Sequence, residues 1–248
     1  AGCDAAPDIT TPATLPLEPV QPSPTFLATQ APLTAHTPSQ ADTTLDTGTP
    51  APTLLPLPQY TLTSTLDYAA HHLVTAEQIV YTNRTGETLE ELALMIPPLD
   101  FPGVFTLQQM AWEDGNPVQG SSLQGSRMKV PLRAPLPPGE AVELHISYEI
   151  QLPSPTPSAE VRPIPFGYTA RQTNLVDWYP FVAPYVPGEG WLAHQPGYFG
   201  EHLVLPLVDF HVRLRIYETG FPLTVAASTE AQRSAAGEYI YNLPAARS

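Results

Sequence analysis

The stretch VELHISYEI at residues 142–150 alternates apolar and polar side chains without an error. Successive side chains of a β-strand point to opposite faces, so this period of two predicts a strand with one buried and one exposed face. Residues 208–216 (VDFHVRLRI) repeat the pattern. The side chains of this second strand that we predict to face outward are Asp209, His211, Arg213 and Arg215.

Further runs of the same kind lie at short spacing between residues 60 and 243. Turn signals such as Asn83–Gly86 and Asp114–Pro117 separate them. No convincing amphipathic helix accompanies them. Nine or ten short strands predict an all-β fold, built as an antiparallel β-sandwich or barrel. The remaining predicted strands are 60–68, 73–82, 92–96, 105–112, 128–132, 223–227 and 239–243.

The first 58 residues have a different composition. They hold 12 Pro and 12 Thr, no Lys or Arg, and one aromatic residue, Phe26. Such a segment buries too little apolar surface to offset the entropy lost on ordering it, and its prolines favour extended polyproline II conformations. We therefore predict a disordered Pro/Thr-rich linker over residues 1–58, followed by one β-sandwich domain over residues 59–248.

Cys3 is the only cysteine, and it stands in the sequence Ala1-Gly2-Cys3-Asp4. This context resembles the end of a bacterial lipobox, where the signal peptide is cut before a cysteine whose thiol is then lipidated. A chance cysteine near a frayed terminus is the alternative. The long linker that follows favours the lipobox, because a lipid anchor needs a spacer. We expect an extracytoplasmic, membrane-anchored lipoprotein at the cell surface, with Cys3 lipidated.

The charge distribution excludes one class of partner. The chain has 24 acidic and 10 basic side chains, and five of the acids but none of the bases lie in the linker. The predicted domain therefore carries 19 acidic and 10 basic residues. Nucleic-acid binding needs a basic surface, so we expect no nucleic-acid partner. No stretch approaches the ~20 apolar residues of a membrane span.

Motifs for catalysis are missing. A His-Glu-x-x-His zinc site needs a Glu directly after a His, and none of the seven histidines has one. His71 and His72 are adjacent, so on a strand they would point to opposite faces. His194, Glu201 and His202 form only a weak cluster, and a surface or core role is favoured. Residues 120–125 (GSSLQG) lack the G-x-S-x-G spacing and are expected to form a flexible hairpin loop. We predict no catalytic and no metal-binding residue.

Residues 153–206 are rich in aromatic residues, Pro and Gly, and are expected to form ordered loops and short strands. Two interpretations compete. Trp178, Tyr185 and Trp191 could form an exposed platform for sugar rings, or the rings could pack against the sheet. The Pro and Gly residues between them favour packed loops.

Several segments then follow one another in an order typical of one enzyme family. They are AEQIVYTN at 76–83, LEELALMIP at 89–97, PGEAVELHISY at 138–148, NLVDWYP at 174–180 and VDFHV at 208–212. The most specific is NLVDWYP. Taken together, residues 60–243 resemble the N-terminal β-sandwich domain of the aminopeptidase N-like zinc metallopeptidases, the family that includes leukotriene hydrolase.

In that family the sandwich does not perform the chemistry. It packs against a thermolysin-like catalytic domain that carries Gly-x-Met-Glu-Asn and the His-Glu-x-x-His zinc helix, neither of which occurs here. The resemblance thus implies a non-catalytic domain that shapes the substrate entrance of a catalytic domain absent from this chain. Zinc is expected in that domain and no cofactor in this one. We also expect a chain truncated before one last strand of the sandwich, with a stand-alone relative as the alternative.

The resemblance also suggests one binding residue. Family members place a Gln or Glu of the sandwich in the subsite for the N-terminus of the substrate, and Gln172 is the nearest candidate. The local sequence departs from the Phe-Pro-Cys-x-Asp-x-Pro pattern of better-known members, so an ordinary loop contact is the alternative. A function of another class is also open: a stand-alone extracellular binding or stalk module on a lipoprotein anchor, for example for carbohydrate.

Overall fold

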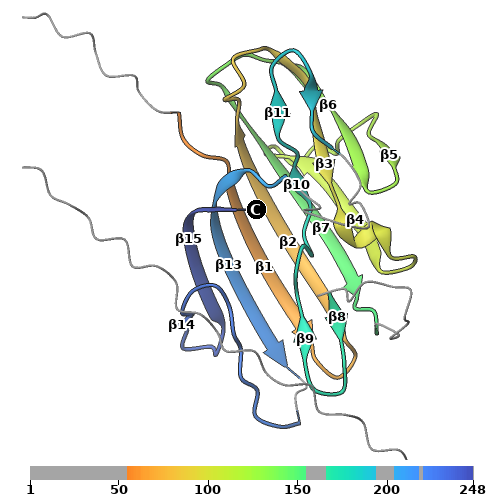
Figure 1. Cartoon of the computed structure of the whole chain (residues 1–248), viewed down its shortest axis with the longest axis vertical. Helices are drawn as coiled ribbons and strands as arrows, with labels where there is room; N and C mark the ends of the chain where they lie inside the picture. The colour runs from red at the N-terminus through yellow and green to blue at the C-terminus, as the bar shows by residue number, and fades with distance from the viewer. Residues whose placement is uncertain (1–54, 155–165, 194–203, 218–219, 248) are drawn as a thin grey trace, which may run out of the picture. The chain divides into compact units, whose positions relative to one another are not determined.

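The computed structural model describes residues 55–154, 166–193, 204–217 and 220–247 (Figure 1). The predictions for Cys3, the linker and the cluster of His194, Glu201 and His202 lie outside these residues. The described part is built of β-strands apart from one short 3-10 helix, Pro97–Asp100, so the predicted all-β class is confirmed. Within it, no helix has the length and apolar character needed to cross a membrane.

The larger sheet has seven strands in the order β14-β15-β13-β1-β2-β7-β4 (Figure 1). The two longest pairs of neighbouring strands coincide with the alternating stretches from which strands were predicted. Each of those stretches can bury one face of its strand. The strands are β14 (Gln232–Arg233), β15 (Tyr239–Arg247), β13 (Leu207–Tyr217), β1 (Gln59–Asp67), β2 (His72–Thr82), β7 (Ala141–Gln151) and β4 (Phe105–Trp112).

This sheet is mixed rather than purely antiparallel. Strands β1 and β13 run parallel, from Gln59 opposite Asp209 to Asp67 opposite Tyr217. The prediction of an antiparallel sandwich is therefore wrong for this pair. Parallel neighbours need a long crossover connection, which the chain between β1 and β13 provides, and side-chain alternation does not encode the direction of a neighbouring strand.

The second sheet has four strands in the order β10-β3-β6-β5, and two small hairpins accompany it. The short strand β5 lies within residues 120–125, which were predicted to form a flexible loop. The strands of the second sheet are β10 (Phe181–Val182), β3 (Leu89–Met95), β6 (Arg127–Leu136) and β5 (Ser122–Gln124). The hairpins are β8 (Gly167–Tyr168) with β9 (Thr173–Asn174), and β11 (Tyr185–Val186) with β12 (Gly190–Trp191).

Side chains of both sheets form one apolar core. Leu144 and Ile150 of β7 are fully buried, and so are Leu92 and Leu94 of β3. Removing such side chains from water is the main favourable term in folding. A hydrogen bond also links the sheets, because the backbone N–H of Val182 in β10 donates to the hydroxyl of Tyr60 in β1 at 2.9 Å.

The predicted strand at 223–227 is absent. Leu223 and Val225 are half-buried while Thr224 and Ala226 are exposed, so the alternation of a strand is present. However, no backbone hydrogen bond joins these residues to any other described residue. Alternation can orient side chains, but a strand also needs a neighbouring backbone to pair with.

Candidate functional site

A groove of about 990 Å³ lies on the inner face of the seven-stranded sheet, where β1, β13 and β15 run side by side. Its sheet side is apolar. The contributing side chains are Leu62, Leu66, Phe210, Val212, Leu214, Ile216, Tyr241, Leu243 and Ala246. A pocket with mainly apolar walls and a few polar groups at its rim is the usual form of a binding site.

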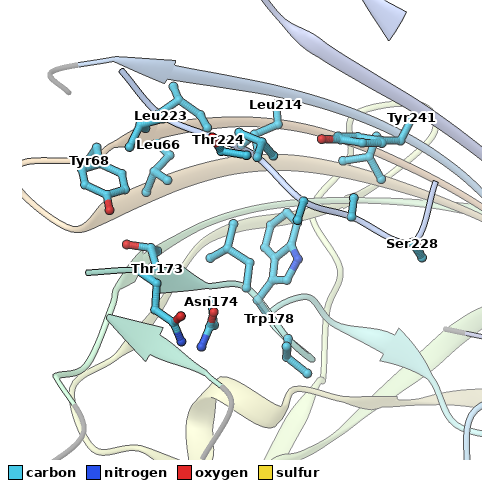
Figure 2. Close-up of a pocket in the computed structure, with 18 of the residues that line it drawn as sticks. Leu66, Tyr68, Thr173, Asn174, Trp178, Leu214, Leu223, Thr224, Ser228 and Tyr241 are labelled. Atoms are coloured by element: carbon cyan, nitrogen blue, oxygen red, sulfur yellow. The ribbon is translucent and has the colours of Figure 1, made fainter. Parts of the chain in front are cut away.

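Two other segments complete the groove. Residues 170–179, from the β8–β9 hairpin and the chain after it, form the opposite wall, and residues 221–228 form a further side. Figure 2 shows Leu66, Leu214 and Tyr241 on the sheet side, with Thr173, Asn174 and Trp178 across from them. The groove thus joins an apolar sheet to a wall that offers polar groups.

The hairpin that forms this wall is held in place at its start. The backbone N–H of Tyr168 donates to the carbonyl oxygen of Pro153 at 2.9 Å, and the Tyr168 ring stacks on His71 with 3.4 Å between centroids. Gly167 has φ of 114°, and a Cβ at this position would lie 2.3 Å from the same Pro153 oxygen. Only glycine fits there, so the close contact with Pro153 positions the whole hairpin.

Gln172 lies at the rim of this groove and its side chain is exposed. Its backbone is fixed in a tight turn, because its carbonyl accepts a hydrogen bond from the N–H of Thr169 at 2.8 Å. Its own N–H donates to Thr169 Oγ1 at 3.3 Å. The Gln172 carboxamide makes no hydrogen bond to any described residue, and the side chain is exposed.

The segment 174–180, which carries the most specific motif, packs onto the sheet. Trp178 is only 8% exposed and meets Tyr179 edge-on, with 5.7 Å between ring centroids. Tyr179 in turn lies edge-on to Phe210 at 5.3 Å. Asp177 adopts φ of 50°, and burial raises the pKa of its carboxyl. For these aromatic rings the packing interpretation is confirmed.

Tyr185 and Trp191 do not form a sugar platform with Trp178. Their rings are half-buried and nearly perpendicular, at 80° with 5.0 Å between centroids. The Tyr185 hydroxyl donates to Glu87 Oε2 at 2.7 Å, and the backbone N–H of Gly188 donates to Glu87 Oε1 at 3.1 Å. A platform for sugar rings needs exposed rings in a common plane, and this arrangement does not provide one.

The two adjacent histidines take separate places, as predicted from their spacing. His71 lies in the turn before β2 with φ of 54° and stacks on Tyr168, whereas His72 Nε2 lies 3.2 Å from Glu149 Oε2. Within the described ranges, no group of three or more His, Cys, Asp and Glu side chains could hold a metal ion.

Sequence reasoning missed a buried carboxyl in the core. Glu77 of β2 is 2% exposed, and neither of its oxygens has a hydrogen bond of normal geometry to a described residue. Burial raises the pKa of Glu77 well above its ordinary value, and the nearby Tyr148 hydroxyl lowers it only in part. Ser64 and Thr75 share a hydrogen bond of 3.0 Å on the same inner face. The signal was available, because Glu77 occupies an inward position of the alternation over residues 73–81.

The groove was missed as well, since it depends on how distant segments assemble. Its two polar neighbours on the wall, Thr173 and Asn174, belong to the two-residue strand β9, which has too few residues to show a period. Gln172 was singled out only through the family resemblance. Its position beside the groove is new information from the structure.

Comparisons with known proteins show which proteins this chain is similar to. No protein-family model matches the chain, and neither does any curated protein. Solved structures do match. The M1 zinc metallopeptidase from Deinococcus radiodurans is 20% identical with a TM-score of 0.44, and the match covers 77% of this chain and 39% of that one.

Two further structures give the same result. A two-domain M1 zinc metallopeptidase variant bound to L-arginine is 18% identical with a TM-score of 0.45, covering 77% of this chain and 39% of that one. A variant of the Deinococcus radiodurans enzyme bound to a Tyr-Ser-Ala substrate is 18% identical with a TM-score of 0.44, covering 75% and 38%. This chain therefore spans well under half the length of the M1 zinc metallopeptidases to which it is similar.

Proposed function

We propose that this chain is the non-catalytic N-terminal domain of a zinc aminopeptidase-like protein, in which it packs against the catalytic domain and shapes the substrate entrance. Zinc then belongs to the catalytic domain, and this chain supplies binding surface. One observation carries the proposal: five residues of the segment 174–180, which bears the most specific family motif, line an apolar groove that also has the exposed Gln172 in its lining.

The chemistry of the rim fits an aminopeptidase substrate. Such a substrate presents a terminal ammonium, whose N–H groups need acceptors. The side-chain oxygen of Gln172 is a free acceptor, and the neighbouring turn around Thr169 holds its backbone in place. A carboxamide anchored in this way can bind the ammonium without the cost of desolvating a charged carboxylate.

We further propose that the protein is tethered to the outer surface of a membrane by a lipid on Cys3. The support is the sequence context of Cys3 and the Pro/Thr-rich linker after it. Metabolic labelling with a radioactive fatty acid in the native host tests this. Label should appear in the wild-type protein and disappear in Cys3→Ser, and an unlabelled wild-type protein would refute the anchor.

The coding sequence downstream of Ser248 tests the enzymatic part. We expect it to encode Gly-x-Met-Glu-Asn and His-Glu-x-x-His, and we expect the longer polypeptide to release p-nitroaniline from amino-acid p-nitroanilides in a zinc-dependent way. Residues 1–248 alone should show no turnover. A stop codon directly after Ser248 would remove the enzymatic part, and turnover by residues 1–248 alone would contradict it.

In the longer polypeptide, Gln172→Ala tests the substrate contact. A hydrogen bond to a charged group contributes about 1.5–3 kcal/mol, so KM should rise at least about tenfold while kcat stays nearly constant. Gln124→Ala is the matched control, because Gln124 is an exposed glutamine of β5 outside the groove lining. Equal KM values for the two variants would show that Gln172 makes only a loop contact.

A further inference from the structure

A second, smaller pocket of about 300 Å³ lies where β1 and β13 begin and β2 ends. Its lining comes from three parts of the chain. The large sheet contributes Tyr60 and Tyr81, the hairpin strand β11 contributes Tyr185, and the turn after β2 contributes Arg84. Pockets for small molecules hold about 300–1,000 Å³. This pocket lies at the lower end of that range, so it suits a small ligand.

The walls of this pocket are aromatic and held in place. Tyr60 is 1% exposed, and its hydroxyl accepts the hydrogen bond from the Val182 N–H that links the two sheets. Tyr81 and Tyr185 both pack against Trp191, with 6.1 and 5.0 Å between the ring centroids. Aromatic rings prefer edge-on or offset contacts with other rings. A ligand with an aromatic ring therefore matches the walls of the pocket.

A cationic side chain lies at the rim on a rigid turn. Arg84 is exposed and lies between Asn83 and Thr85. The side-chain amide of Asn83 donates to the carbonyl oxygens of Glu87 and Leu136 at 2.8 and 2.7 Å. Its oxygen accepts from the backbone N–H and the hydroxyl of Thr85 at 3.0 and 2.7 Å. The backbone that carries Arg84 is thus fixed before a ligand binds, which lowers the entropic cost of binding.

Two hydrogen-bond donors of the pocket lack an acceptor. Among the described residues, no acidic side chain forms an ion pair with Arg84. Glu87 is engaged elsewhere, because its carboxylate accepts hydrogen bonds from the Tyr185 hydroxyl and the Gly188 N–H. Burial raises the pKa of Tyr81 to about 12, so its hydroxyl stays protonated at neutral pH and can donate. No described residue accepts that hydrogen bond.

The rest of the lining offers apolar surface. Leu207, the first residue of β13, lines the pocket and is 52% exposed. Pro58, Pro184 and Pro206 also line it, and proline has no N–H to offer a ligand. Mainly apolar walls with a few polar groups that orient the ligand are typical of small-molecule sites.

We propose that this pocket binds a small aromatic carboxylate, with its ring among Tyr60, Tyr81 and Tyr185 and its carboxylate on Arg84 and the Tyr81 hydroxyl. The planar guanidinium of an arginine matches the geometry of a carboxylate. A free acid and the C-terminal residue of a peptide share this chemistry. The chain carries a formal charge of −14, so the affinity must come from these short-range contacts rather than from long-range attraction.

Isothermal titration calorimetry with the full chain tests the proposal. The probes are 3-phenylpropionate, which represents a free acid, and N-acetylphenylalanine, which represents a peptide C-terminus. The controls are the amides of the two acids. At least one acid should bind saturably, and at least about tenfold more tightly than its amide, because the amide lacks the charge that pairs with Arg84. The acid that binds more tightly identifies the source of the natural ligand.

Matched variants locate the binding. Arg84→Gln should weaken binding of the acid at least about tenfold and change binding of the amide less than about twofold. Arg215→Gln is the control, because Arg215 is an exposed arginine of β13 outside the lining and its loss changes the net charge equally. Tyr81→Phe keeps the ring and removes the hydroxyl, so binding should weaken about fivefold. Circular dichroism should show the same fold for each variant.

Four results would overturn the proposal. They are the absence of saturable binding by either acid, equal affinities of the acids and their amides, equal losses in Arg84→Gln and Arg215→Gln, and complete displacement of the acid by an equal concentration of inorganic sulfate. The last result would show that the rim binds any anion and that the aromatic walls contribute nothing. None of these measurements depends on a downstream zinc domain, so they test the pocket separately from the proposed function.

Discussion

The two halves of the seven-stranded sheet share one architecture and differ in what covers them. In the β2–β7 half, Leu73, Ile79, Leu144 and Ile150 are fully buried in the common core with the second sheet. In the β13–β15 half, the inner face meets a loop wall and the segment 221–228, which pairs with no described strand, and Val212 and Ile216 are only half-buried. The second sheet covers the first, closed half, whereas a groove of about 990 Å³ remains on the second, open half.

The same contrast appears in the acidic side chains. Glu77 lies in the closed half and is 2% exposed, whereas Asp177 is half-buried, next in sequence to the groove residues Val176 and Trp178. Burial raises the pKa of both carboxyls, and it does so far more strongly for Glu77. Burial in the closed half thus favours the neutral form of the Glu77 carboxyl more strongly than partial burial does for Asp177.

Truncating one leucine in each half should show the largest difference. Leu144→Ala leaves a cavity in the closed core under β7, where the side chain is fully buried, and should lower the free energy of unfolding by about 3 kcal/mol. Leu223→Ala removes a half-buried side chain beside the groove and should cost less than about 1 kcal/mol. Urea denaturation followed by tryptophan fluorescence measures both.

The slope of the urea transition serves as the control, since it should be the same for both variants if the compact state is unchanged. Equal losses in the free energy of unfolding would contradict the contrast between the two halves of the sheet. They would mean that segment 221–228 is packed as tightly as the core of the sandwich.

Replacing Glu77 should change the pH dependence of stability. The folded-state pKa is raised above the unfolded value of about 4.3. Above that value the unfolded state loses a proton that the folded state keeps, so stability present at low pH is lost as pH rises toward the folded pKa. The wild-type protein should therefore lose up to about 1.4 kcal/mol per pH unit from this group, and Glu77→Gln should not.

Thermal unfolding from pH 4.5 to pH 8 in buffers of constant ionic strength tests this. The Tm of Glu77→Gln should rise relative to that of the wild-type protein as pH increases. Glu143→Gln is the matched control, because Glu143 is half-buried on β7 and hydrogen-bonds to Gln78 and His145, which lower its pKa. A Glu77→Gln curve parallel to that of the wild-type protein would show that the carboxyl is ionised in the folded state.

The closed half was the part most readily predicted from sequence. Residues 105–112 form β4 with the predicted bounds, and β7 extends the predicted strand over 142–150 by one residue at each end. Period-two alternation is a local property, and from Leu144 to Ile150 of β7 it agrees with how the strand is buried. Glu77 was the local exception, because a buried acid without a basic partner breaks the expected pattern.

The open half was predicted less well, because its structure depends on pairing between residues far apart in the sequence. The parallel pairing of β1 with β13 joins residues far apart in sequence, and the alternation over residues 223–227 predicted a strand that lacks a partner among the described residues. The two-residue strands β8 to β12 are too short to show a period. Gln172 could be named from the family resemblance, but its place at the groove depends on Gly167 and Pro153.

The smallest effect expected concerns Asp177, which lies in the chain segment that forms the groove wall. Asp177→Asn removes a carboxyl whose pKa is raised by partial burial, and Asn tolerates the positive φ of this position. Above the unfolded pKa of about 3.9, stability contributed by the protonated carboxyl is lost as pH rises through the folded pKa. The Asn variant should therefore gain stability over the wild-type protein between pH 4 and pH 7, by less than Glu77→Gln gains. Asp177→Ala is the contrasting variant and should lose about 1 kcal/mol at every pH, because alanine disfavours positive φ. If the Asn variant gained as much as Glu77→Gln, the groove wall would be as dry as the core, and the contrast between the two halves of the sheet would fail.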